Sequence, residues 1–258
     1  MNITLPDGTT LHYTDSGGTN PTIILLHGGL VTAELMWSTH LPKLTSHYRV
    51  IAPDTRGHGH SDNPAGHFGY DRFADDCAAL ITELSLERPA VIGYSDGAQT
   101  ALELGMRRPE LVSALVLGGV IAEPTAHYRD ALAAIGFTTP GEVDTALFDR
   151  TIPGFLDVIK NLHGADYVPE FMADTSRLWL TLPTYTDQQL AGIPVPTLVI
   201  TGDRDEGPLD QAPRLCRTIP HTELAVIPGA DHAAIERTLF ADIVIDFLTR
   251  SGKPAETT

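Results

Sequence analysis

AVIGYSDGAQTAL, residues 90–102, organises the interpretation of the whole chain, because it joins a short apolar run, a serine between two glycines and a run with helical character. This order predicts a strand, a sharp turn and a helix. Residues 93–97 fit the pattern G-x-S-x-G, the nucleophile elbow, in which small residues flank a serine held at a strained backbone angle. Such a turn lifts Ser95 above the strand end, and the helix N-terminus beside it favours negative charge. The motif therefore predicts a place where an oxyanion can form, provided that the rest of the chain supports it.

Composition indicates a single globular unit. With 258 residues, of which 42% are hydrophobic, the chain can bury one large core, as α/β domains with an insertion do. It has 17 basic and 33 acidic residues, a net charge of −16, which argues against nucleic acid or an anionic membrane as a partner because both are bound through basic patches. Cys77 and Cys216 lie far apart without metal-ligand spacing, so we expect neither a disulfide framework nor a zinc site.

No targeting or membrane-spanning segment is expected. The residues after Met1 show neither the basic nor the apolar region of a signal peptide. No segment reaches the roughly 18 uninterrupted apolar residues of a membrane span. We therefore expect a cytoplasmic protein that acts on a small molecule, with its oligomeric state left open.

Apolar runs and helical patterns alternate along much of the chain, which predicts a mostly parallel central sheet flanked by helices. Two extended runs around the turn at 6–9 predict an N-terminal hairpin. Further strands are predicted at 22–26, 48–53, 111–117, 194–201 and 224–227. Helices are predicted at 71–84, 98–106, 209–218 and 234–248.

Strand patterns largely disappear between residues 121 and 193, where helical stretches broken by proline and glycine replace them. These stretches are 128–135, 142–148, 155–162 and 169–180. The predicted domains are a core in two parts, 1–120 and 194–250, a helical cap insertion, 121–193, and a flexible tail, 251–258. Most aromatic residues of the insertion are expected in its core, while a few should line a pocket.

Loops rich in glycine and polar residues follow several predicted strands, and parallel pairing places them at one edge of the sheet. They are 27–30 (HGGL), 54–62 (DTRGHGHSD), 202–205 (GDRD) and 228–232 (PGADH). The histidines at 58, 60 and 67 raise the question of a metal site. Histidines that alternate with glycines in a loop lack the helical pairing and the three converging ligands of a catalytic metal site. We therefore expect no metal, and no cofactor.

A serine hydroxyl becomes a good nucleophile only when a base accepts its proton, and the base needs a carboxylate to hold its tautomer. The order Ser95, Asp205, His232 matches the order serine, acid, histidine of α/β-hydrolases. From Leu25 to Leu248 the chain resembles that superfamily, in serine-nucleophile members such as esterases and lactonases. The resemblance rests on five ordered motifs: the turn at 27–29, the D-x-R-G-x-G-x-S loop at 54–61, the elbow at 93–97 and the motifs at 202–205 and 228–232.

By this resemblance Ser95 is the nucleophile, His232 the general base and acid, and Asp205 the orienting carboxylate. Asp203 and Asp231 are alternatives for the carboxylate. The resemblance selects Asp205, because family members usually carry the acid at the fourth position of the G-x-x-D turn.

Asp96 departs from the family pattern, in which the residue after the serine is commonly apolar. The resemblance implies that the N–H groups of Asp96 and Gly29 bind the oxyanion, or that of Leu30 if the turn is shifted. A carboxylate facing the pocket would repel that oxyanion. We prefer the interpretation in which Asp96 turns aside and caps or pairs locally at the helix N-terminus. In the other interpretation it faces the substrate and binds a cation, as similarity to the Gly-x-Ser-Asp-Gly group that includes valacyclovir hydrolase implies for α-amino esters.

The sequence thus favours a serine hydrolase that cleaves a small carboxylic ester or lactone through an acyl-enzyme. Carbon–carbon bond hydrolysis and cofactor-free perhydrolysis use the same triad and stay open. A ligand receptor with slow turnover is an alternative from a different class. Candidate substrate-binding residues are Asp96, Trp37, Tyr128, Phe137 and Trp179.

Overall fold

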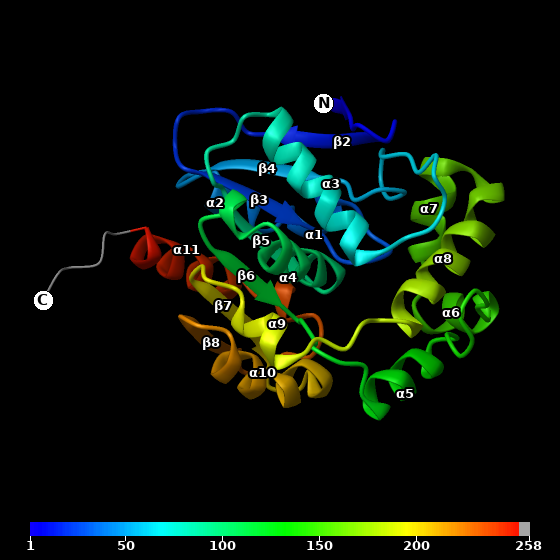
Figure 1. Cartoon of the computed structure of the whole chain (residues 1–258). Helices are drawn as coiled ribbons and strands as arrows, with labels where there is room; N and C mark the ends of the chain where they lie inside the picture. Colours follow the sequence, from blue (N-terminus) through cyan, green and yellow to red (C-terminus); the bar gives the residue numbers. More distant parts are fainter. Residues whose placement is uncertain (253–258) are drawn as a thin grey trace, which may run out of the picture.

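A central eight-stranded sheet dominates the computed structural model, which describes residues 1–252 (Figure 1). The strand order is β1-β2-β4-β3-β5-β6-β7-β8. The strands are β1 (Asn2–Thr4), β2 (Thr10–Asp15), β3 (Thr22–Leu26), β4 (Arg49–Pro53), β5 (Ala90–Tyr94), β6 (Leu115–Gly118), β7 (Thr197–Gly202) and β8 (Thr222–Ile227). The β1–β2 and β2–β4 pairs are antiparallel, and the other neighbouring strands run parallel. The predicted fold class and the N-terminal hairpin are confirmed.

Helices cover both faces of this sheet. Successive side chains of a strand point to opposite faces, and in the parallel strands both sets are buried under helices. In β3, Ile24 and Leu26 belong to an apolar cluster that also takes in residues of α3 (Tyr70–Glu83), α4 (Asp96–Arg107) and α10 (Glu206–Thr218). Ile23 and Leu25 point the other way, toward α1 (Ala33–Trp37), α2 (Leu41–Leu44) and α11 (Leu239–Ser251). The sheet is therefore the middle of three layers, and its carboxyl edge is held rigidly from both sides.

The chain between β6 and β7 adds a group of helices at one end of the sheet (Figure 1). These helices are α5 (Ala126–Ala134), α6 (Thr145–Thr151), α7 (Phe155–His163), α8 (Val168–Leu180) and α9 (Asp187–Ala191). Apolar side chains of α5–α8 form a third core cluster, which includes Phe148 and Phe171 and also takes in Phe73 from α3. Tyr185 and Leu190 pack instead with the sheet core. The inserted helices thus share one apolar cluster with the body of the protein.

Some predicted element bounds differ from the structure, in two cases because prolines intervene. The strand predicted from residue 111 begins at Leu115, because Pro109–Leu111 form a 3-10 turn. The strand predicted from 194 begins at Thr197, after two prolines that have no N–H for the ladder. The helix predicted from 234 is a 3-10 turn, Ala234–Glu236, followed by α11. Of the predicted tail, Ser251 ends α11, and residues 253–258 lie outside the described residues.

Candidate active site

The elbow is a strand-to-helix turn with a strained serine at its tip. Strand β5 ends at Tyr94, α4 begins at Asp96, and Ser95 between them has φ 53° and ψ −119°. A side chain at Gly93 would overlap the carbonyl of Gly97, and one at Gly97 would overlap the carbonyl of Leu26 on β3. Both glycines are therefore required by close backbone approach.

Three side chains from different loops meet in a hydrogen-bonded row. Ser95 Oγ lies 3.0 Å from His232 Nε2, and His232 Nδ1 lies 2.9 Å from Asp205 Oδ2. Asp205 follows β7 and His232 follows β8, so both reach the row from the carboxyl edge of the sheet. The two alternative acids are engaged elsewhere. Asp203 accepts a hydrogen bond from the N–H of Ala230, and Asp231 accepts one from the N–H of Ala233.

The ring of His232 is held in a negative field. Burial lowers its pKa, but the hydrogen bond and charge of Asp205, with the nearby carboxylates of Asp96 and Asp231, outweigh burial and raise the pKa above its ordinary value. In the neutral imidazole, the proton on Nδ1 is directed toward Asp205. Nε2 is then unprotonated and can accept the proton of the Ser95 hydroxyl. The row is thus arranged for proton transfer from serine to histidine.

A second turn, at residues 27–30, faces the elbow from the end of β3. The N–H of Thr55 donates to Nε2 of His27, so Nδ1 of that ring carries the proton and donates to the carbonyl of Gly28 at 2.6 Å. Leu30 adopts a left-handed conformation, φ 67°. No described residue accepts a hydrogen bond from the N–H of Gly29, Leu30 or Asp96. These groups are candidates for holding an oxyanion beside Ser95.

Asp96 does not cap its own helix, contrary to the interpretation preferred from the sequence. Its carboxylate accepts a hydrogen bond from the hydroxyl of Tyr70 at 2.8 Å and from the indole N–H of Trp179 at 2.9 Å. Burial raises the pKa of Asp96, and the two donors offset this only in part. Among the described residues, no lysine or arginine pairs with it. A side chain at Gly29 would overlap this carboxylate and would come within 2.8 Å of the Trp179 ring. The turn at 27–30 therefore packs closely against both Asp96 and Trp179.

A cavity of about 540 Å³ opens above Ser95. Its lining residues are Gly29, Leu30, Tyr70, Ser95, Asp96, Gln99, Gly119, Ile121, His127, Tyr128, Ala131, Leu132, Ile135, Ile152, Phe155, Trp179, Leu182, Arg204, Asp205, Gly207, Pro208, Asp231 and His232. The inserted helices supply most of the apolar wall, and α4 with the loops after β7 and β8 supplies the polar part.

The structure brings Asp96, Tyr128 and Trp179 together at this cavity but not Trp37 or Phe137. The prediction for Trp37 is corrected: it is fully buried on α1 and packs against Phe240 of α11, on the other face of the sheet core. Phe137 is also fully buried, behind Trp179, with their ring centroids 4.8 Å apart. It supports a lining residue without lining the cavity itself.

Tyr70 and Gln99 line the cavity and were not predicted from the sequence. Tyr70 is the first residue of α3 and lies outside the predicted motifs, and no local signal identifies it. Gln99 is a polar amide among small and apolar residues just after the elbow. This exception to the local pattern is the signal that could have identified it.

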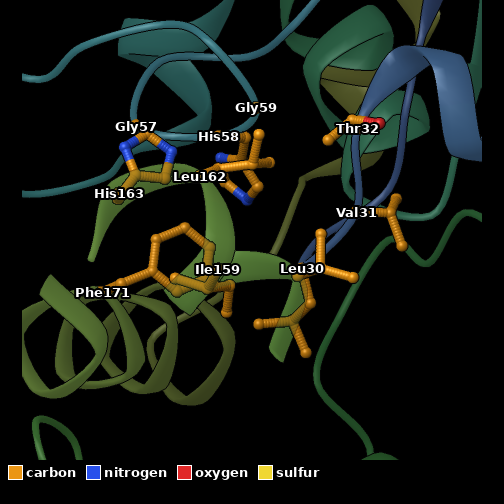
Figure 2. Close-up of a pocket in the computed structure, with 11 residues that line it drawn as sticks. Leu30, Val31, Thr32, Gly57, His58, Gly59, Ile159, Leu162, His163 and Phe171 are labelled. Atoms are coloured by element: carbon orange, nitrogen blue, oxygen red, sulfur yellow. The ribbon is translucent and has the colours of Figure 1, made fainter. Parts of the chain in front are cut away.

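The loop 54–62 anchors the inserted helices and encloses a much smaller hollow (Figure 2). There residues 57–59 meet side chains of α7 and α8, and the rings of His58 and Phe171 lie 4.8 Å apart. Burial, with the neighbouring His27, lowers the pKa of His58 to about 3. The hollow measures about 10 Å³, so it is a packing gap between loop and helices rather than a ligand site.

Within residues 1–252, no group of three or more His, Cys, Asp or Glu side chains is arranged to hold a metal ion. In the same part of the chain no helix combines the length and the apolar character needed to cross a membrane.

Comparisons with known proteins identify the family of this chain. A model of the alpha/beta hydrolase family matches residues 23–241. The chain is 30% identical to a 2-hydroxy-6-oxo-2,4-heptadienoate hydrolase of Pseudomonas putida, over 93% of this chain and 92% of that protein. It is also 30% identical to a 2-hydroxymuconate semialdehyde hydrolase of a Pseudomonas species, over 96% and 92%. Among solved structures it resembles the enol-lactonase of Burkholderia xenovorans, with a TM-score of 0.74 and 25% identity over 96% of this chain and 100% of that one. The chain therefore belongs to the alpha/beta hydrolase family.

Proposed function

We propose that this chain is a serine hydrolase that cleaves small carboxylic esters or lactones through an acyl-enzyme at Ser95. The observation that carries the proposal is the row from Ser95 through His232 to Asp205, with contacts of 3.0 and 2.9 Å. Ser95 Oγ attacks the carbonyl carbon while His232 Nε2 takes the hydroxyl proton, and Asp205 stabilises the resulting imidazolium. The N–H of Asp96, with that of Gly29 or Leu30, binds the oxyanion.

The second half of the reaction uses the same atoms in reverse. His232 gives its proton to the departing alcohol oxygen as the acyl–oxygen bond breaks. A water molecule then loses a proton to His232 and attacks the acyl carbon. The bond between that carbon and Ser95 Oγ breaks, and His232 returns the proton to Oγ. For a lactone the alcohol stays attached to the acyl group, and the product is a hydroxy acid.

We further propose that α5–α8 act as a cap that selects the substrate. They contribute Tyr128, Leu132, Phe155 and Trp179 to the cavity wall. A mostly apolar wall of this kind favours a substrate with an apolar group.

Carbon–carbon bond hydrolysis is the second candidate, because two relatives at 30% identity are named as hydrolases of oxo-dienoate or semialdehyde compounds. The charges in the cavity favour the ester or lactone. Asp96, Asp205 and Asp231 line it, whereas Arg204 is the only arginine or lysine among the lining residues that the structure describes, and it is exposed. A substrate with its own carboxylate would meet net repulsion near Ser95.

The test combines labelling with a substrate panel. Ser95→Ala should abolish both hydrolysis and labelling by a fluorophosphonate, while Ser38→Ala, an exposed serine at the end of α1, should leave both unchanged. Asp205→Asn should lower kcat by about 10⁴-fold, and the matched variant Asp203→Asn should lower it far less. Persistent turnover by Ser95→Ala would refute the mechanism.

The panel contains p-nitrophenyl esters, lactones, amino-acid esters and vinylogous diketones. Preferred turnover of neutral esters or lactones supports the proposal. Preferred turnover of the diketones would replace it with carbon–carbon hydrolysis. A single slow turnover on every compound would indicate a receptor.

A further inference from the structure

Gln99 carries a buried carboxamide that no residue in the described part of the chain satisfies. Its side chain is 3% exposed, and neither its amide nitrogen nor its amide oxygen has a hydrogen-bond partner among the described residues. A buried amide without partners costs folding free energy, because it gives up its hydrogen bonds to water. Gln99 nevertheless lines the catalytic cavity.

A second buried glutamine shows how this fold uses a carboxamide for structure. Gln211 on α10 is 5% exposed, and its amide oxygen accepts hydrogen bonds from the N–H groups of Ala122 and Glu123. Its amide nitrogen donates to the carbonyl of Glu123. Gln211 therefore links the start of the inserted helices to α10, whereas the carboxamide of Gln99 makes no such bond within residues 1–252.

The position of Gln99 on α4 directs it toward the reaction. It follows Asp96 by three residues, so the two side chains share one face of the helix. Helical side chains lean toward the N-terminus of their helix, and the N-terminus of α4 is the elbow that carries Ser95. Gln99 thus lies one helical turn after Asp96, among the residues that line the cavity, with its carboxamide buried there.

The surroundings restrict what this carboxamide can bind. An anion would be repelled by Asp96 on the same face, and a cation would leave the N–H groups of Gln99 unpaired. Asp96 itself is occupied by Tyr70 and Trp179. The complement of an unpaired carboxamide is a neutral group that both donates and accepts hydrogen bonds.

We propose that Gln99 forms a polar subsite that recognises a neutral hydroxyl or carboxamide group on the substrate. This proposal rests on the proposed ester or lactone hydrolysis and names its substrate class. The substrate is then amphipathic, with its apolar part against the inserted helices and its neutral polar group at Gln99. A site built to hydrogen-bond such a group discriminates strongly against an analogue that lacks it.

Two matched substrate pairs test the subsite on either side of the ester bond. Methyl succinamate and methyl 4-methylpentanoate differ only in exchanging a carboxamide for an isopropyl group in the acyl part. Glycolamide acetate and isobutyl acetate differ in the same way in the alcohol part. The measurement is the carboxamide-to-alkyl ratio of kcat/KM, compared between wild type and variants so that intrinsic reactivity cancels.

Gln99→Met should lower this ratio about tenfold in one pair, and Gln211→Met should leave it unchanged. A fall of threefold or more in either pair supports the subsite, and a smaller change in both pairs overturns it. If Gln99→Met does not fold, Gln99→Leu takes its place.

Thermal unfolding gives an independent result. Gln99→Met should raise Tm or leave it unchanged, since it removes an unpaired buried amide, whereas Gln211→Met should lower Tm. A fall in Tm for Gln99→Met as large as that for Gln211→Met would overturn the proposal, because it would show that the carboxamide holds the fold.

Binding separates this proposal from the proposed reaction. Methyl succinamate and glycolamide acetate are added to Ser95→Ala and to Ser95→Ala/Gln99→Met, and the rise in Tm is measured. A larger rise in the single variant supports recognition by Gln99 even if no ester is hydrolysed. Equal rises overturn recognition even if Ser95 proves to be the nucleophile.

Discussion

Gly29→Ala tests whether the turn at 27–30, the carboxylate of Asp96 and the ring of Trp179 form one close-packed unit. An alanine Cβ would overlap the Asp96 carboxylate and lie 2.8 Å from Trp179 Cζ2. Neither neighbour can move cheaply, because Asp96 holds two hydrogen bonds and Trp179 is backed by Phe137. Overpacking of this kind costs about 1–3 kcal/mol of stability, which lowers Tm by several degrees in a domain of this size.

The same displacement would move the N–H groups beside Ser95, and kcat/KM should fall on the order of 10²-fold. The assay pairs urea unfolding with ester hydrolysis. Gly207→Ala is the matched control, because Gly207 lines the same cavity and a Cβ there meets nothing within 4 Å. It should be neutral, or stabilising by up to about 1 kcal/mol through helix propensity.

A double-mutant cycle separates crowding from other effects. In the Asp96→Ala background, the cost of Gly29→Ala should be smaller by about 1 kcal/mol, because the overlapping carboxylate is gone. An equal cost in both backgrounds, or an equal cost for Gly207→Ala, would refute the close-packed unit.

Three further outcomes are expected. The raised pKa of His232 places the acid limb of the kcat/KM profile above pH 6.5, and an acid limb well below pH 6.5 would contradict this. The protonated ring also stabilises the fold below pH 6.5, and this stabilisation is lost as the pH rises through the raised pKa. Trp179→Phe removes one donor from the Asp96 carboxylate and should cost about 1–3 kcal/mol in urea unfolding, with no change as the contrary result. Arg56→Leu should cost about 3–5 kcal/mol, because it leaves the buried carboxylate of Asp76 without its partner; a loss below about 1 kcal/mol would show that Asp76 finds another.

The sequence was informative wherever a feature depends on neighbouring residues. The elbow at 93–97 and the loops at 202–205 and 228–232 can be recognised in the sequence. Tight turns after buried strands need particular small or polar residues at fixed spacing. Parallel pairing then places their polar ends at one edge of the sheet. The fold class follows from the same alternation of strands and helices.

Side-chain partners from distant segments could not be predicted in this way. Local capping rules favoured an Asp96 that caps or pairs at its own helix N-terminus. Its hydrogen-bond partners instead come from α3 and α8, which tertiary packing brings to the elbow. The sequence does not distinguish aromatic residues of the core from those that line a cavity. Trp37 packs under α11, whereas Trp179 lines the cavity. Burial of Gln99 likewise depends on elements that no local pattern positions.

The tertiary partners of Asp96 also change what its charge means for the reaction. Next to a developing oxyanion a bare carboxylate would oppose catalysis. Tyr70 and Trp179 donate two neutral hydrogen bonds to it, and burial raises its pKa, so its negative charge is partly offset inside the fold. A substrate ammonium is then not needed to neutralise Asp96. Among the described residues that line this cavity, Gln99 has a neutral carboxamide without hydrogen-bond partners, so a substrate can supply hydrogen bonds there rather than at the carboxylate.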